Sequence, residues 1–167
     1  MIKKRMIKLS VRKRIKQASY LKVDSAFELL AVFTENVESP SAQTTSKRYT
    51  VDSNTTQSVT GYEWSSSFTG DQMESDEVVK YIRNIGEMCL TGSDAESEYL
   101  IVDLDQAAAT AGSYRARKFN VAIQVDEFPD NDGELGLSGS FLGQGDPILG
   151  TFDTATKTFT EGFTPSV

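Results

Sequence analysis

The strongest constraint on the fold is an alternation of apolar and polar side chains with a period of two. It is clearest over residues 117–128, RKFNVAIQVDEF. Successive side chains of a strand point to opposite faces, so this pattern predicts a half-buried β-strand. Residues 129–133, PDNDG, have the composition of a turn, and residues 134–142 then alternate again. The apolar faces expected here consist of Phe119, Val121, Ile123 and Val125, and of Leu135, Leu137, Gly139 and Phe141.

Shorter segments of the same kind predict strands along much of the remaining chain. Residues 20–33 are expected to form one or two short strands, with Phe27, Leu29, Ala31 and Phe33 on one side. Further strands are expected at residues 48–51, 62–68 and 99–104, and in a last hairpin made by residues 148–153 and 157–162. Together these segments predict about eight strands.

One segment, residues 75–86 with the sequence SDEVVKYIRNIG, has the features of a helix. Ser75 is expected to be the N-cap, and the acids after it lie where the helix dipole favours negative charge. Val78, Ile82 and Ile85 share one face of a helix, and Gly86 is expected just beyond its C-terminus. We therefore expect an α+β protein, mainly β: an antiparallel β-sandwich or small barrel with one flanking α-helix.

Residues 34–47, TENVESPSAQTTSK, are rich in serine and threonine and contain a proline. This composition predicts a long loop. Loops of that length are uncommon inside compact domains and often carry function.

The residue types present exclude several kinds of reactive site. The chain has no histidine and a single cysteine, Cys89, so neither a Ser-His-Asp triad nor the common zinc sites can be built. The acids do not suggest a site either, because Asp103 and Asp105 read as solvated and Asp130 and Asp132 as part of a turn. We therefore nominate no catalytic, cofactor-binding or metal-binding residue and expect no enzyme. No apolar run approaches the ~20 residues that span a bilayer, so no membrane partner is expected.

Charge is distributed very unevenly along the chain. Residues 1–16 contain eight lysines and arginines and no acid, whereas residues 17–167 contain nine bases and all 24 acids. This predicts a basic N-terminal arm, residues 1–16, followed by a single β domain, residues 17–167. The arm fits a strand with one basic face, a basic amphipathic helix or a solvated tail that orders only in an assembly. The acidic domain is expected to bind nucleic acid poorly, because it repels phosphate.

Two features outside the arm concern the polar and basic residues of the longest predicted strands. If residues 117–128 and 134–142 pair, their second face is made of small, uncharged or acidic groups. Arg115, Arg117 and Lys118 form a further basic cluster, in which alternation places the last two on opposite faces. We expect these three bases to be surface or subunit-contact charges.

The order of several motifs resembles one known family. ARKFNVAIQVDEF followed by DGELGLSGSFLGQGDPILGTFDTATKTFT is similar to the end of siphophage major tail proteins, the tail tube proteins. GYEWSSSFTGDQ, followed by a short helix, resembles the middle of that family. The resemblance covers roughly residues 18–161, and the basic first 16 residues depart from the family pattern.

The resemblance implies a structural subunit whose hexameric rings stack into a conduit for genome delivery. It implies that DNA passes without specific binding, and that the partners are other copies of the chain, the tape measure protein, the tail terminator and distal tail or baseplate proteins. The implied location is the virion tail, assembled in the cytoplasm of a bacterial host. Lumen-facing candidates are Asn120, Gln124, Asp126, Ser138 and Ser140, and subunit-contact candidates are Lys8, Arg12, Glu38, Ser39, Pro40, Ser41 and Gln43.

Two other functions compete with this interpretation. One is the inner tube of a contractile tail or a tail-like bacteriocin. The other, from a different class, is a β-sandwich module that binds carbohydrate or another ligand; such modules usually present exposed aromatic platforms.

Overall fold

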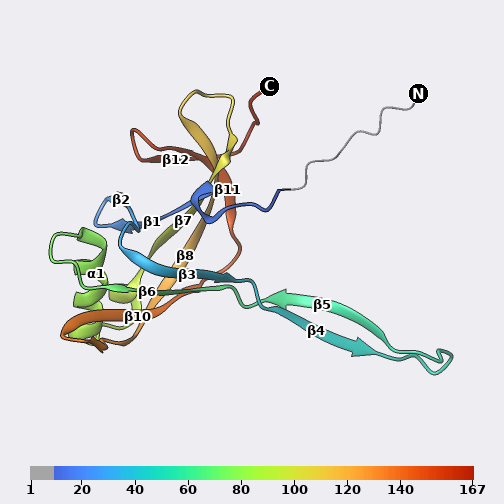
Figure 1. Ribbon diagram of the computed structural model, residues 1–167. Helices are drawn as coiled ribbons and strands as arrows, with labels where there is room; N and C mark the ends of the chain where they lie inside the picture. Colours follow the sequence, from blue (N-terminus) through green and yellow to red (C-terminus); the bar gives the residue numbers. More distant parts are fainter. Residues whose placement is uncertain (1–9) are drawn as a thin grey trace.

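The computed structural model describes residues 10–167 and shows a β-rich body from which one long hairpin projects (Figure 1). The body contains one α-helix, α1 (Glu77–Glu87), and two short 3-10 helices, η1 (Arg14–Lys16) and η2 (Gly92–Ala95). The strands are β1 (Gln17–Val23), β2 (Ala26–Leu29), β3 (Phe33–Ser39), β4 (Ala42–Lys47), β5 (Thr56–Tyr62), β6 (Ser65–Asp71), β7 (Glu96–Ala107), β8 (Ser113–Glu127), β9 (Asp130–Asn131), β10 (Glu134–Gly143), β11 (Ile148–Asp153) and β12 (Thr158–Glu161).

The strands of the body form one curled antiparallel sheet in the order β2-β1-β7-β8-β10-β6-β3, with β11 pairing with β8 and β12 with β11. This half-barrel with one helix confirms the predicted fold class, mainly β within α+β. The expected pairing of the two longest alternating segments is also confirmed, because β8 and β10 pair with Gln124 opposite Ser140. The last hairpin is present as well, with Phe152 of β11 opposite Phe159 of β12.

The main core lies between α1 and one face of the sheet. Val78, Ile82 and Ile85 of the helix are buried in it, as their spacing predicted. Phe119, Val121 and Ile123 of β8 and Leu137 and Phe141 of β10 are buried in the same cluster. The alternation along β8 and β10 therefore identified the core face correctly over most of its length.

A second, smaller apolar cluster lies on part of the opposite face of the sheet. Leu100 and Val102 of β7 pack there with Tyr20, Phe27 and Phe152. Tyr99 and Ile101, the residues that alternate with them, belong to the main core. The centre of β7 is thus buried on both faces, which explains its continuous apolar sequence.

The ends of α1 differ from the prediction. The N-cap is Asp76 and not Ser75, because the Asp76 carboxylate accepts a hydrogen bond from the backbone N–H of Val79. Gly86 lies inside the helix, which ends at Glu87. A Cβ on Gly86 would lie 2.7 Å from side-chain atoms of both Val125 and Phe128, so this glycine permits close packing of α1 on β8.

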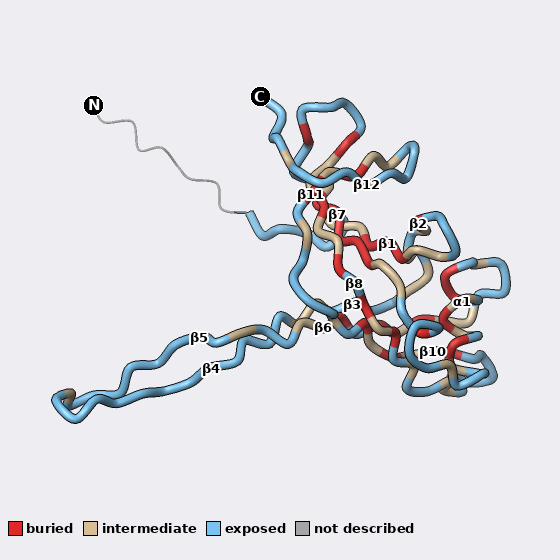
Figure 2. Tube along the Cα trace, turned by 180° about the vertical axis from the view of Figure 1, so that it is seen from behind, coloured by how far each residue is buried: buried red, intermediate tan, exposed pale blue. Residues whose placement is uncertain are grey.

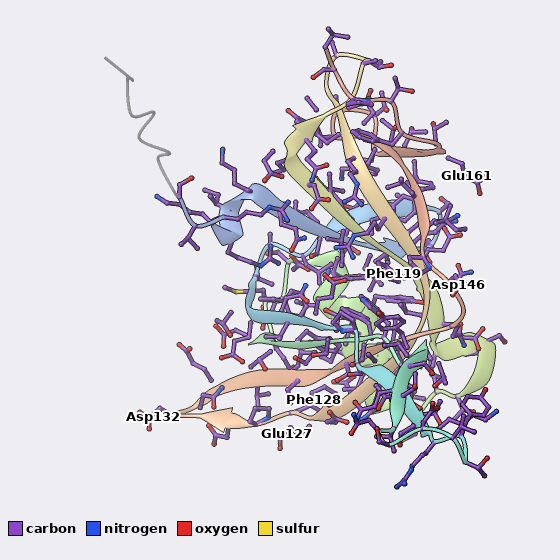
Figure 3. The ribbon with its side chains drawn as sticks, turned by 90° about the vertical axis from the view of Figure 1, so that its right-hand side faces the viewer. Phe119, Glu127, Phe128, Asp132, Asp146 and Glu161 are labelled. Carbon is purple, nitrogen blue, oxygen red and sulfur yellow. The ribbon has the colours of Figure 1, made fainter. Side chains whose placement is uncertain are left out.

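Three residues of the predicted apolar strand faces are exposed. Leu29 and Ala31 are exposed because the chain turns after β1, and β2 already ends at Leu29, so no single alternation runs through residues 20–33. Leu135 is exposed because it pairs with Asp130 of β9, near the β9–β10 turn. Figure 3 shows Asp132 at the tip of this turn.

The segment 34–51 was predicted least well. Residues 34–47 are not a loop, because they form most of β3 and all of β4. Residues 48–51 are not a strand, since they belong to the turn at the tip of the β4–β5 hairpin, where the Asp52 N–H donates to the Tyr49 carbonyl.

Candidate functional site

The β4–β5 hairpin is a separate two-stranded sheet that projects from the body (Figures 1 and 2). Every residue of β4 is exposed, and Val51 and Tyr49 at the tip expose 92% and 56% of their surface. A two-stranded hairpin is at best marginally stable alone in water. An exposed arm with apolar residues at its tip is therefore a candidate for contact with another molecule.

The hairpin is attached to the body through Glu38, at the end of β3. Arg117 donates two hydrogen bonds to the Glu38 carboxylate, at 2.7 and 3.1 Å, and Trp64 Nε1 donates another at 2.8 Å. Burial acts to raise the pKa of Glu38, but these bonds outweigh it and hold that pKa below its usual value. Trp64 in turn stacks on Phe119, with ring centroids 3.9 Å apart.

A pocket of about 400 Å³ lies between this cluster and the loop that joins β10 to β11. Its lining residues include Trp64, Arg117 and Phe119, together with Pro40 and Tyr62 from the base of the hairpin. Figure 3 labels Phe119 and Asp146, which approach the pocket from the sheet and from the loop.

The subunit-contact candidates of residues 38–43 lie at this base. Ser39 ends β3, Pro40 and Ser41 are exposed between β3 and β4, and Gln43 lies in β4. Glu38 differs from them, because its carboxylate is bound to Arg117 of its own chain. Arg117 was expected as a surface or subunit-contact charge, and its intrachain partner explains its partial burial.

The second candidate contact region precedes β1. There the Arg12 side chain forms ion pairs with two aspartates of β7. Its guanidinium contacts Asp103 at 2.7 Å and Asp105 at 2.8 Å. Arg115 contacts the other oxygen of Asp103 at 2.5 Å, and Gln17 donates to Asp103 at 3.2 Å.

The prediction that Asp103 is solvated is wrong, because its side chain is only 2% exposed. A buried carboxylate needs charged or hydrogen-bonding partners, and here they come from residues 12, 17 and 115. Contact of Arg12 with a neighbouring subunit stays a prediction. Lys8 lies outside the described residues.

The five lumen-facing candidates lie on one polar face of the sheet. Asn120, Gln124 and Asp126 are exposed, whereas Ser138 and Ser140 are half-buried. Ser140 lies opposite Gln124, and the Gln124 amide donates to Asp126 at 2.6 Å. Ser138 lies opposite Glu127, where the register shifts by a bulge.

This face continues onto two strands that the sequence did not connect with it. Ser67 of β6 lies opposite Ser140 on one side and Val37 of β3 on the other. Thr69 likewise lies between Ser138 and Glu35. None of β3, β6 and β10 contains a lysine or arginine, so these three strands add no base to the polar face. Residues 33–39 gave no usable signal, because Val37 is exposed on this face and a bulge after Phe33 interrupts the register.

Across residues 10–167, no helix has the length and apolarity needed to cross a membrane. Over the same described part of the chain, no three histidine, cysteine, aspartate or glutamate side chains gather as a metal site.

Comparison with protein-family models finds no match, and neither does comparison with curated proteins. Solved structures do match. The chain superposes on a subunit from the tail of an empty gene transfer agent particle, refined with C6 symmetry, with a TM-score of 0.60 and 14% identity. The alignment covers 90% of this chain and 99% of that one. The chain therefore shares the fold of that tail chain.

A second match, to a chain of the native gene transfer agent virion, has a TM-score of 0.55, 14% identity and the same coverage. The shared fold thus extends over most of the chain. The resemblance noted in the sequence is confirmed for the fold.

Proposed function

We propose that the chain is a structural subunit of a bacteriophage tail tube, in which rings of six copies stack into a conduit for DNA. The observation that carries this proposal is the likeness of nearly the entire chain to a subunit of a gene transfer agent tail. That tail was refined with C6 symmetry, which supports six copies in each ring.

Edge strands support the closure of a ring. β3 ends the order of the main sheet, so its outer edge presents backbone N–H and C=O groups with no strand beside it in the described chain. Such edges template pairing with another chain. A neighbouring copy that adds a strand there would continue the sheet around the ring through directional hydrogen bonds.

The β4–β5 hairpin supports contact between subunits. It extends beyond the body, and its tip exposes Tyr49 and Val51. We propose that the hairpin reaches a neighbouring subunit and is stabilised there, with Ser39, Pro40, Ser41 and Gln43 at its base as contact residues. We also propose that the basic arm adds contacts to an adjacent acidic body, through Lys8 and through Arg12, whose side chain is 46% exposed although it is paired with Asp103 and Asp105 of its own chain.

The polar face suits the wall of a DNA conduit. DNA carries about one negative charge per 1.7 Å of its axis, so free lysines and arginines along a lumen would retain it. We propose that Asn120, Gln124, Asp126, Ser138 and Ser140 face the lumen, because they offer small polar or acidic groups. DNA would then pass without specific binding.

This role places the protein in the virion tail after assembly in the cytoplasm of a bacterial host. Its further partners would be a tape measure protein, a tail terminator and distal tail or baseplate proteins. We also propose that it has no enzymatic activity.

Negative-stain electron microscopy of the purified chain tests the proposal. Rings with a central hole, or tubes built from them, are expected at raised protein concentration. A strictly monomeric species in light scattering, at high concentration and across a range of salt, would overturn it.

A further inference from the structure

Two lysines border the polar face, and both contact the same carboxylate. Lys22 of β1 and Lys118 of β8 lie on either side of β7, which carries Glu98. The Lys22 ammonium lies 3.0 Å from one Glu98 oxygen, and the Lys118 ammonium lies 3.4 Å from the other. Glu98 is opposite Asn120 in the sheet, so it shares a face with the lumen-facing candidates.

The surroundings fix this group of three charges. Lys22 lies over the ring of Phe27, with Nζ 5.8 Å from the centroid, and Lys118 lies over Phe159 at 5.3 Å. The Glu98 side chain is 28% exposed. Burial acts to raise the pKa of Glu98, but the hydrogen bond from Lys22 and the charge of Lys118 hold it below its usual value. Glu98 therefore remains charged throughout the neutral pH range.

The local charge balance depends on this one residue. Glu96, two positions earlier on β7, has the same orientation and accepts a hydrogen bond from Gln144 at 3.0 Å. Glu98 is the carboxylate that contacts both lysines. Without Glu98, both ammonium groups would lose the ion pair that the described chain gives them.

We infer that Glu98 masks Lys22 and Lys118, so that neither ammonium group is free to contact the phosphates of DNA that passes the polar face. This inference rests on the proposed conduit function. Bases are present on this part of the wall, and a single side chain, Glu98, forms ion pairs with both of them. Glu98 is a positioning residue, because it acts through the lysines that it holds.

The test is duplex DNA binding by the full chain as a function of salt. Each phosphate that a protein neutralises steepens the dependence of log K on log salt by about 0.9. Glu98→Gln is expected to bind a duplex roughly tenfold more tightly than wild type at low salt. The slope of log K against log salt should be steeper by about 1.8, which corresponds to about two added phosphate contacts. The basic arm is the same in both proteins, so its contribution to DNA affinity and to the salt slope is equal in the two.

Matched variants separate masking from a general loss of negative charge. Glu35→Gln removes one charge from the same face on β3, at the far edge of the sheet, and should leave the slope unchanged. Adding Lys22→Gln and Lys118→Gln to Glu98→Gln should return affinity and slope to wild-type values. If Glu98→Gln does not fold, Glu98→Asp is the alternative variant. It keeps the charge but shortens the side chain, so the carboxylate can no longer reach both lysines. It should free one lysine and steepen the slope by about one contact.

Equal binding by Glu98→Gln and Glu35→Gln would overturn the inference, as would tight binding by the triple variant. Electron microscopy of the wild type tests the tail-tube proposal separately. A failure of masking in a protein that forms normal tubes therefore leaves that proposal standing.

Discussion

Replacing Arg12 with glutamine should destabilise the domain, although residue 12 precedes its first strand. The change removes the ion pairs to Asp103 and Asp105. Asp103 is buried and keeps Arg115 and Gln17 as partners. It therefore loses only part of the bonding that offsets the cost of burying its charge. A hydrogen bond to a charged group contributes about 1.5–3 kcal/mol, and the exposed pair with Asp105 about 0–1 kcal/mol.

Because Arg12 is 46% exposed, its contribution belongs at the low end of these ranges. We expect the free energy of unfolding to fall by about 1–2 kcal/mol at neutral pH. For a domain of this size, that lowers Tm by roughly 2–8 °C.

The effect should depend on pH with a defined sign. Burial acts to raise the pKa of Asp103, but hydrogen bonds from Arg12, Gln17 and Arg115 outweigh it and hold that pKa below its ordinary value of 3.8. A carboxyl with a lowered pKa stabilises the folded state above its ordinary pKa, and this contribution is lost as the pH falls through the folded value. The Tm difference between wild type and Arg12→Gln should therefore be constant from about pH 5 upward and shrink below about pH 3.8.

Thermal unfolding followed by circular dichroism, in samples that light scattering shows to be monomeric, measures this difference. Arg14→Gln is the matched control, because Arg14 is exposed and, among residues 10–167, its side chain donates only to the backbone carbonyl of Gln17, at 2.6 Å. If Arg12→Gln and Arg14→Gln melt at the same temperature at pH 7, the ion pairs of Arg12 do not stabilise the fold and this reasoning is wrong.

Three further outcomes are expected. Replacing residues 42–62 with a short turn should abolish the tubes seen by electron microscopy. It should shift Tm by less than about 4 °C, because the β4–β5 hairpin lies outside both cores. Normal tubes from this variant would refute the role of the hairpin in assembly. Gly86→Ala should destabilise the domain by up to about 2 kcal/mol in chemical denaturation, because overpacking against Val125 and Phe128 costs about 1–3 kcal/mol and the gain in helix propensity offsets only ~1 kcal/mol of it. An increase in stability would contradict the close packing. Ser140→Lys should steepen the salt dependence of DNA binding by about 0.9 per subunit, and an unchanged slope would argue against an accessible polar face.

The sequence predicted the centre of the fold well because that is where burial differs between faces. β8 and β10 alternate since one face packs on α1 and the other is polar, and Val78, Ile82 and Ile85 repeat with the period of a helix. The same reasoning explains the failure over β3 and β4. β4 is exposed on both faces, so it has no apolar alternation for a sequence to show.

The contacts of charged residues could not be predicted from local patterns. Asp103 and Arg115 are close in the chain, but the third member, Arg12, is more than 90 residues away from Asp103. Glu38 and Arg117 are likewise 79 residues apart. Pairing of this kind is determined by the register of neighbouring strands, which a local pattern does not specify. The polar face was identified on β8 and β10 only, because its continuation depends on the position of β6 and β3 in the sheet.

The burial of β7 on both faces has a consequence for how the subunit can move. Its central amides are covered by two apolar clusters and paired with β1 and β8, so they should exchange with solvent only when the whole domain unfolds. Regions that open locally have few buried contacts, and the β4–β5 hairpin is the clearest example in the described chain. A mechanical signal that arrives at one subunit would therefore displace its body as a rigid unit, with adjustment confined to the hairpin.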